Sequence, residues 1–251
     1  MITQDYPLDK SDETEQCASR HRMSKRMTLV IGSLCANGMV FCSDTEEGTG
    51  GGGKRYVHKI FEFHGDRWEM LVGTAGFGPL CEIAVNRIQQ AVKADGFIEN
   101  SETQIQQIMT DVYQKFVPKT LSDWKQQDRQ ISLVIGVMNR QSGIAMSLYQ
   151  TTEEILHPVQ HHFACAGVGQ EIAYYLLDRL FDPSSKYHEA HELLTFVMRE
   201  AKASVGNVGG NTEMLTIGDS GGTLRETFGP GWESRQPRLA DHLKKFWMDK
   251  E

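Results

Sequence analysis

Hydrophobic residues along the chain follow two spacings, which predict alternating blocks of strands and helices. Short apolar or period-two runs, typical of strands, cover 28–35, 38–43, 57–63, 68–72, 131–138, 144–149, 154–157, 162–166, 213–217 and 223–228. Apolar residues at helical spacing cover 77–94, 101–117, 170–181 and 188–203. The predicted order is therefore four strands, two helices, four strands, two helices and two strands.

Turn and cap signals support these boundaries. Ala36-Asn37-Gly38 joins the first two strands, and Asn37 and Gly38 both tolerate the positive φ of a tight hairpin. Pro79 suits the first turn of the first helix, and Ser101 is the expected N-cap of the second.

This order predicts the fold class. Strongly apolar strands need cover on both faces, and long antiparallel hairpins need it on at least one. Two antiparallel sheets packed face to face between helix pairs meet that requirement. We therefore expect an α+β protein, a four-layer α/β/β/α sandwich, with residues 28–228 as one domain.

The flanking segments differ from this domain in composition. Residues 1–27 are a polar extension that lacks the apolar core of a secretory signal. A disordered tail, a removable propeptide and a start codon assigned too early all remain open. The tail at 229–251 carries an apolar stripe at helical spacing that predicts a short amphipathic helix, formed by Leu239, Leu243, Phe246 and Trp247.

Composition narrows the class of protein. The formal net charge of -7 argues against nucleic acid or an anionic membrane as a partner. No apolar run approaches the roughly 20 residues that cross a bilayer. The five cysteines form no CxxC pair, which favours free thiols in a reducing compartment such as the cytoplasm, and neither a metal nor a cofactor is expected.

One motif points to a different chemistry. Residues 48–54 fit GxxxxGK, the loop that cradles nucleotide phosphates. Arg55 stands where a Ser or Thr should bind Mg²⁺, and a strand pattern follows where a helix is required. A hairpin loop is the better interpretation, and 219–222 is likewise best interpreted as a turn.

Three residues at one end of adjacent predicted strands form a candidate site. Thr28 opens the first strand, Asp44 ends the second, and Lys59 lies early in the third. The hairpin brings Asp44 back beside Thr28, and Lys59 enters at the same end. A hydroxyl nucleophile needs an adjacent base, which a free α-amine on the same residue supplies. A buried lysine held by a carboxylate would lower the barrier electrostatically.

The same segments make the chain resemble a proteasome β-type subunit and its simpler bacterial homologues. They are MTLVIG at 27–32, NGMV at 37–40, SD at 43–44, HKI at 58–60, TAG at 74–76, AGVGQ at 166–170 and GG at 209–210. The likeness covers about 28–228 and implies an N-terminal-nucleophile hydrolase that cleaves peptides or other amides. It implies Thr28 as nucleophile, Asp44 and Lys59 as the supporting pair, and the Gly76 N–H as oxyanion donor at the start of the first helix. A homo-oligomeric ring is also implied, and whether an unfoldase serves as a partner stays open.

Some positions depart from the family pattern. Val168, Val205 and Val208 replace polar residues that surround the threonine amine in active subunits. Polar residues that could compensate are Ser204, Asn207 and Asn211. Thr28 must also become the first residue, either by removal of 1–27 or by initiation at Met27 followed by loss of that methionine. An inactive subunit that serves assembly or scaffolding is the alternative.

Overall fold

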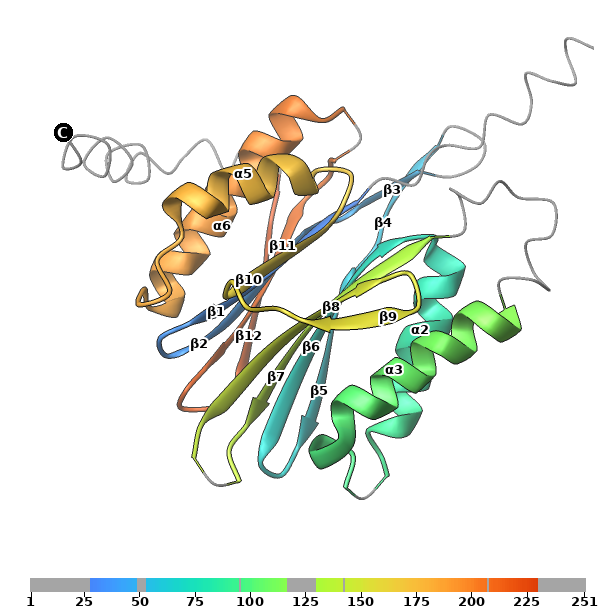
Figure 1. Ribbon diagram of the computed structural model, residues 1–251. Coiled ribbons are helices and arrows are strands. Elements are labelled where there is room, and N and C mark those ends of the chain that lie inside the picture. Colours follow the sequence, from blue (N-terminus) through green and yellow to red (C-terminus); the bar gives the residue numbers. More distant parts are fainter. Residues whose placement is uncertain are drawn as a thin grey trace, which may run out of the picture.

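Two five-stranded antiparallel sheets lie face to face in the computed structural model, and a pair of helices covers the outer face of each (Figure 1). The structure describes residues 28–48, 53–94, 96–116, 130–141, 143–206 and 208–229. The predicted extension at 1–27 and the predicted tail helix lie outside these residues. Within them, the predicted four-layer α/β/β/α sandwich is confirmed.

The first sheet has the strand order β10-β1-β2-β11-β12, and the second has the order β5-β6-β7-β8-β9. The strands of the first sheet are β1 (Leu29–Cys35), β2 (Gly38–Asp44), β10 (Phe163–Gly167), β11 (Thr212–Gly218) and β12 (Thr223–Phe228). Those of the second are β5 (Ile60–Gly65), β6 (Trp68–Gly76), β7 (Ile131–Asn139), β8 (Ala145–Thr152) and β9 (Ile155–Pro158).

The helices fall into two pairs, as predicted. They are α2 (Gly78–Ala91) with α3 (Ser101–Asp111), and α5 (Gln170–Leu180) with α6 (Tyr187–Ser204). A 3₁₀ turn at Ile98–Asn100 leads into α3, and a π-helical turn at Val112–Phe116 follows it.

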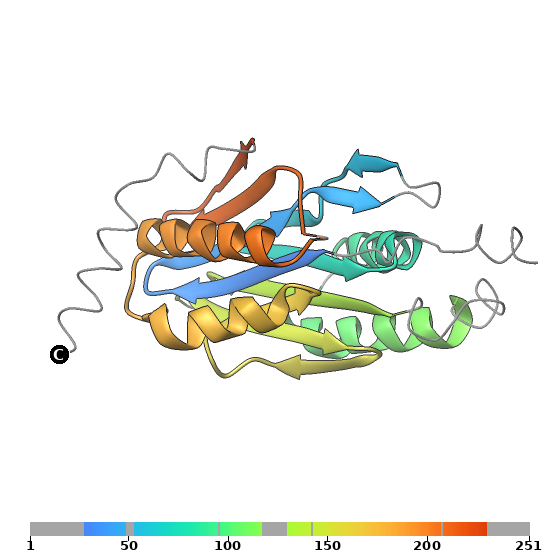
Figure 2. The ribbon, with the colours of Figure 1, turned by 90° about the horizontal axis from the view of Figure 1, so that it is seen from above.

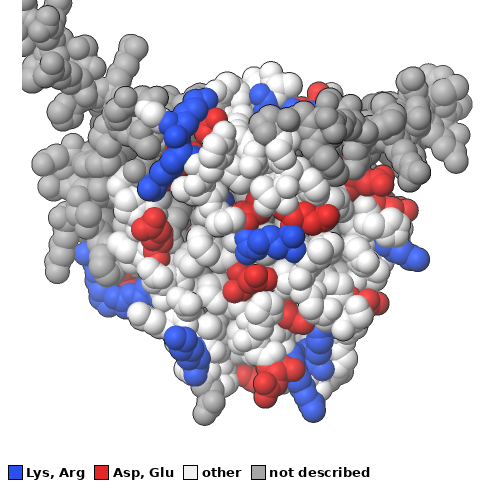
Figure 3. Space-filling view, turned by 180° about the vertical axis from the view of Figure 1, so that it is seen from behind, with Lys and Arg blue, Asp and Glu red and all other residues white. Residues whose placement is uncertain are grey.

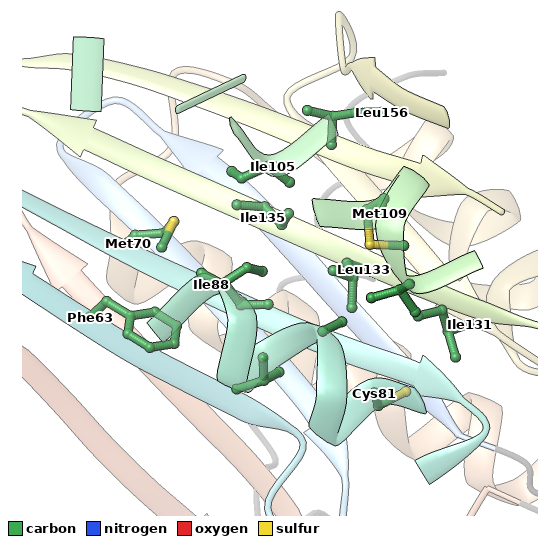
Figure 4. Packing of buried hydrophobic residues seen from close by; sticks show 14 of the residues in the cluster. Phe63, Met70, Cys81, Ile88, Ile105, Met109, Ile131, Leu133, Ile135 and Leu156 are labelled. Carbon is green, nitrogen blue, oxygen red and sulfur yellow. The ribbon is translucent and has the colours of Figure 1, made fainter. Parts of the chain in front are cut away.

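Three apolar layers hold the sandwich together. Val30, Phe41 and Leu215 belong to the cluster between the two sheets, and each is 0% exposed. A second cluster lies between the second sheet and α2 and α3, where Ile88, Met109 and Leu133 are buried together (Figure 4). The third lies between the first sheet and α5 and α6. Each fully buried large side chain contributes about 1.5–3 kcal/mol of transfer free energy, so these layers dominate the stability of the fold.

A two-stranded ribbon, β3 (Glu46–Gly48) with β4 (Lys54–Tyr56), extends past the sheets (Figure 1, Figure 2). The sequence pattern did not predict it, because its residues are mostly charged and have no apolar period. Residues 49–52 lie outside the described part, but Gly48 and Lys54 are paired across the ribbon. A strand therefore follows the glycine-rich segment, where a phosphate-binding loop would need a helix.

One local prediction, the cap of the second helix, is wrong. Ser101 is not an N-cap, because the 3₁₀ turn already makes the backbone helical before it and Asn100 occupies that position. The β1–β2 hairpin forms, yet neither Asn37 nor Gly38 has positive φ. Glycine is needed at position 38 because a Cβ there would lie 2.2 Å from the Ile217 carbonyl oxygen of β11.

The surface carries mixed charge. On the face shown in Figure 3, acidic and basic side chains of the described residues are interspersed. No helix in the described ranges is both long enough and apolar enough to span a bilayer.

Candidate active site

Thr28, Asp44 and Lys59 meet at one end of the two sheets. Thr28 immediately precedes β1, and Asp44 is the last residue of β2, opposite the start of β1. Lys59 lies in the segment that leads into β5 of the other sheet, and not early in a strand as predicted. All three are buried, with 7%, 0% and 4% of their surface exposed.

The Asp44 carboxylate joins the two sheets through Lys59. Its Oδ1 accepts hydrogen bonds from Lys59 Nζ at 3.0 Å and from the Leu29 N–H at 2.9 Å. Its Oδ2 accepts from the Gly209 N–H at 3.2 Å. Lys59 Nζ also donates to the Glu46 carbonyl oxygen at 2.6 Å. The ammonium is therefore fixed between a carboxylate and a carbonyl.

Burial and pairing act on this pair in opposite directions. Burial raises the pKa of the Asp44 carboxyl, while Lys59 and the Leu29 and Gly209 N–H groups counteract that rise. Burial likewise lowers the pKa of the Lys59 ammonium, and Asp44 counteracts it. Three donors converge on Asp44, an arrangement that suits an ionised carboxylate.

Close backbone contacts fix Thr28. Its carbonyl oxygen accepts a hydrogen bond from the Val168 N–H at 2.9 Å. The preceding Gly167 has φ of +104°, and a Cβ on it would lie 1.7 Å from the same oxygen. Only glycine lets β10 turn this closely over Thr28.

Two cavities meet at Thr28. The smaller, about 250 Å³, has Lys59, Thr74 and Gly76 in its wall together with Glu47 and Glu82. The larger, about 420 Å³, is bordered by Gly76, Gly167 and Val168, and by the polar side chains of Ser132, Gln170 and Glu171. Thr28 is therefore accessible from two cavities.

Gly76 borders both cavities, but it does not begin a helix. It is the last residue of β6, paired with Ile131 of β7, and Phe77 is the N-cap of α2. Its φ is +112°. The prediction of a helix-start N–H at this residue was wrong because the strand continues through Gly76 and α2 begins two residues later.

The three valines occupy different environments. Val208 is buried in the apolar layer under α5 and α6, and Val205 packs against that layer. Val168 is 43% exposed and borders the larger cavity. Ser204 and Asn211, which could have compensated, border neither cavity. Asn207 is not among the residues that the structure describes.

Sequence reasoning missed the polar groups that do lie beside Thr28. Gln170 and Glu171 open α5, and Ser132 lies on β7. The position of Gln170 directly after the Gly-Val-Gly turn was the available signal. In the described ranges, no group of three or more His, Cys, Asp or Glu residues is placed to hold a metal ion.

Several solved structures share this fold. Anbu, described as an ancestral beta-subunit, from Yersinia bercovieri has a TM-score of 0.72 and 13% sequence identity, covering 88% of this chain and 97% of its own. A Gly-1 mutant of Anbu from Hyphomicrobium sp. strain MC1 has a TM-score of 0.72, 12% identity and the same coverages. The helical assembly of the Anbu complex from Pseudomonas aeruginosa has a TM-score of 0.70 and 17% identity, covering 89% of this chain and 96% of that one.

No curated protein sequence matches significantly. The family model described as proteasome subunit, however, matches residues 25–217, more than half of the chain. With the two-sheet sandwich and its helix pairs, this match shows that the chain belongs to the proteasome subunit family.

Proposed function

We propose that this chain is a threonine-type amide or peptide hydrolase that acts through Thr28 once residues 1–27 are removed. The observation that carries the proposal is the shared cavity wall: Thr28 and Lys59 border the same space. Asp44 and the Glu46 carbonyl hold the Lys59 ammonium in place.

The first half of the reaction forms an ester on the enzyme. The free α-amine of Thr28 takes the proton from Oγ, and Oγ attacks the substrate carbonyl carbon. The Lys59 ammonium stabilises the negative charge that develops on the attacking oxygen, and the Gly76 N–H donates to the oxyanion. The C–N bond then breaks, and the departing amine takes the proton from the α-ammonium.

The second half regenerates Thr28. The α-amine accepts a proton from a water molecule, which attacks the ester carbonyl. The C–O bond to Thr28 breaks, Oγ regains a proton, and the carboxylic acid leaves. An amide nitrogen at Thr28 is not basic enough for either half, so Met27 must be absent.

The cellular setting follows from the same proposal. Four scattered thiols buried in the described residues suit a reducing cytoplasm. Self-assembly into a ring or a helical array would enclose the cavities; the Anbu complex from Pseudomonas aeruginosa forms a helical assembly. An unfoldase would deliver extended chains to such an enclosure.

A second candidate is an inactive subunit that serves assembly. It is favoured by the apolar side chains at Val168, Val205 and Val208, which leave fewer polar groups to tune the α-amine. Gln170 and Glu171, which border the larger cavity with Thr28, weigh against it.

A covalent probe tests the proposal. We expect a peptide vinyl sulfone to modify one residue, Thr28, in protein whose intact mass shows Thr28 as the first residue. Thr28→Ala should abolish labelling and turnover with an unchanged thermal midpoint, and Thr28→Ser should retain labelling. Equal labelling of the alanine variant would refute the proposal, and intact mass showing Met1–Met27 retained in the natural protein would favour the inactive subunit.

A further inference from the structure

Glu213 is a fully buried carboxylate at the Thr28 end of the sheets. It lies on β11, between Ser43 of β2 and Thr227 of β12. Alternate residues of a strand face opposite sides. Leu215 belongs to the cluster between the sheets, whereas Met214 belongs to the cluster under α5 and α6. Glu213 therefore points from the first sheet toward the second, and it is 0% exposed.

The partners of Glu213 belong to the segment that carries Lys59. Its Oε2 accepts a hydrogen bond from the Lys59 backbone N–H at 3.3 Å, and its Oε1 lies 2.7 Å from His58 Nδ1. Arg225 of β12 is also ion-paired with Glu213, and it donates to the Ile60 carbonyl oxygen at 3.3 Å. Glu213 and Arg225 together contact three consecutive residues, 58 to 60.

This contact matters because residues 57–59 belong to no strand. The Val57 N–H donates to the Thr45 carbonyl at 2.9 Å, and the Lys59 carbonyl accepts from the Thr74 N–H at 2.9 Å. The Lys59 N–H, between them, is held by Glu213. A catalytic group misplaced by about 1 Å can lose about 10²-fold in rate, so the anchor of this backbone bears on the position of Nζ.

We propose that Glu213 is a positioning residue that holds the Lys59 backbone so that its ammonium stays beside Thr28. The inference rests on the proposed function, because it concerns the same nucleophile. A purely structural tie would affect stability alone. A positioning role also alters the reactivity of Thr28 and its dependence on pH.

The expected pH effect has a definite sign. A nearby ammonium disfavours protonation of the Thr28 α-amine and so lowers its pKa. Releasing Lys59 moves that charge away, so the amine pKa rises and the acid limb of the rate profile shifts to higher pH. Loss of the Glu213 charge by itself lowers the amine pKa, but this loss is common to Glu213→Ala and Glu213→Gln, so the midpoint of the alanine variant is compared with that of the glutamine variant. Of the other ionisable groups near Thr28 and Lys59, His58 and Arg225 lose their Glu213 partner in these variants. Asp44, Glu46, Glu47, Arg55, Glu82 and Glu171 are the same in the wild type and the variants.

The experiment measures the rate at which a vinyl sulfone labels Thr28 in the mature wild type and in three variants. The rate is followed between pH 5 and 10, approximately the range around an α-amine pKa. Glu213→Ala should label about 10–100-fold more slowly, with the midpoint of the acid limb above that of Glu213→Gln. Glu213→Gln keeps an acceptor for the Lys59 N–H, so its labelling rate should lie between those of the wild type and Glu213→Ala. Arg140→Gln is the matched control, since Arg140 ties Glu69 of β6 to the carbonyl oxygen of Gly218 at the opposite end of β11.

The outcomes separate the two proposals. Unlabelled wild type would overturn the proposed function and this inference with it. Labelled wild type with the same midpoint in Glu213→Ala as in Glu213→Gln, or a loss of labelling rate in Glu213→Ala no larger than in Arg140→Gln, would overturn the inference and leave the proposed function standing. If Glu213→Ala does not fold, the labelling rate of Glu213→Gln decides: a loss no larger than in Arg140→Gln would overturn the inference.

Discussion

The Lys59 ammonium lies 3.0 Å from the Asp44 carboxylate, and the two side chains are 5% and 0% exposed. The pair connects β2 of one sheet to the segment before β5 of the other. A buried ion pair contributes little net stability. Removing one partner is nevertheless strongly destabilising, because the other charge is then left buried without compensation.

A double substitution should show this asymmetry. Lys59→Met leaves Asp44 buried without its cation and should lower the free energy of unfolding by about 3–5 kcal/mol. Asp44→Asn combined with Lys59→Met removes both charges and should recover part of that loss, while Thr28 stays unreactive. Urea unfolding measures the first effect and covalent labelling the second. Lys115→Met, in an exposed pair with Asp111, is the control with no measurable change. The explanation would be contradicted if the double variant lost as much free energy of unfolding as Asp44→Asn and Lys59→Met lose together when made singly.

Alanine at two glycines should separate steric contact from backbone strain. Gly167 and Gly143 both have positive φ, +104° and +119°, but nothing lies within 4 Å of a Cβ at Gly143. Gly143→Ala should lower the free energy of unfolding by about 1–3 kcal/mol because of backbone strain. Gly167→Ala should cost about 1–3 kcal/mol more, because its methyl group collides with the Thr28 carbonyl. It should also abolish labelling of Thr28, whereas Gly143→Ala should not. Similar stability and labelling in both variants would show that the contact is unimportant.

Tyr113 should make the protein less stable at alkaline pH. Its hydroxyl donates to the Ile131 carbonyl and accepts from the Ile131 N–H, both at 3.1 Å. Burial raises the pKa of Tyr113 to about 12. Because folding raises this pKa, the contribution is fully present below pH about 10 and is lost as pH rises toward 12.

The difference between wild type and Tyr113→Phe isolates that contribution. We expect the wild type to lose about 1–2 kcal/mol more than the variant across this interval, since the ring is half-buried. Tyr175→Phe, at an exposed tyrosine, should behave like wild type. Absorbance at 295 nm, approximately the phenolate band, follows the titration; a Tyr113 midpoint near 10 would count against the prediction.

The buried thiols should resist alkylation in the native state. Burial raises the pKa of Cys35 to about 11 and raises that of Cys165 as well. At pH 8 only about one Cys35 thiol in a thousand is ionised, and the thiolate is the reactive form. Peptide mass mapping after iodoacetamide should find both residues unmodified in native protein and modified in concentrated urea. Rapid native modification of Cys35 would mean that β1 opens readily.

The sequence allowed the fold to be predicted because its strands and helices have clear apolar periods. Leu29 to Cys35 is buried almost throughout, as expected for a strand covered on both faces. The ribbon of β3 and β4 has no such period, since Glu46, Glu47, Lys54 and Arg55 pair with one another through charge. Period-based reasoning therefore had no signal for it.

The candidate site was predictable where it depends on strand ends and not where it depends on loops. Thr28 and Asp44 follow directly from the β1–β2 hairpin. The site-facing position of Gly76 depends on how far β6 continues, which no local pattern specifies. Glu213 has no local signal in the sequence for its proposed role, because that role depends on a contact with Lys59, 154 residues away in the chain.

The hydrogen bonds around Thr28 bear on when the residues before it can be removed. From Leu29 onward β1 is flanked on both sides, by β2 and β10, and the Val168 N–H anchors the Thr28 carbonyl. None of these bonds involves the amine side of Thr28. Under the proposed function, cleavage before Thr28 would break none of these bonds, so the domain could fold first and gain its reactive amine afterwards.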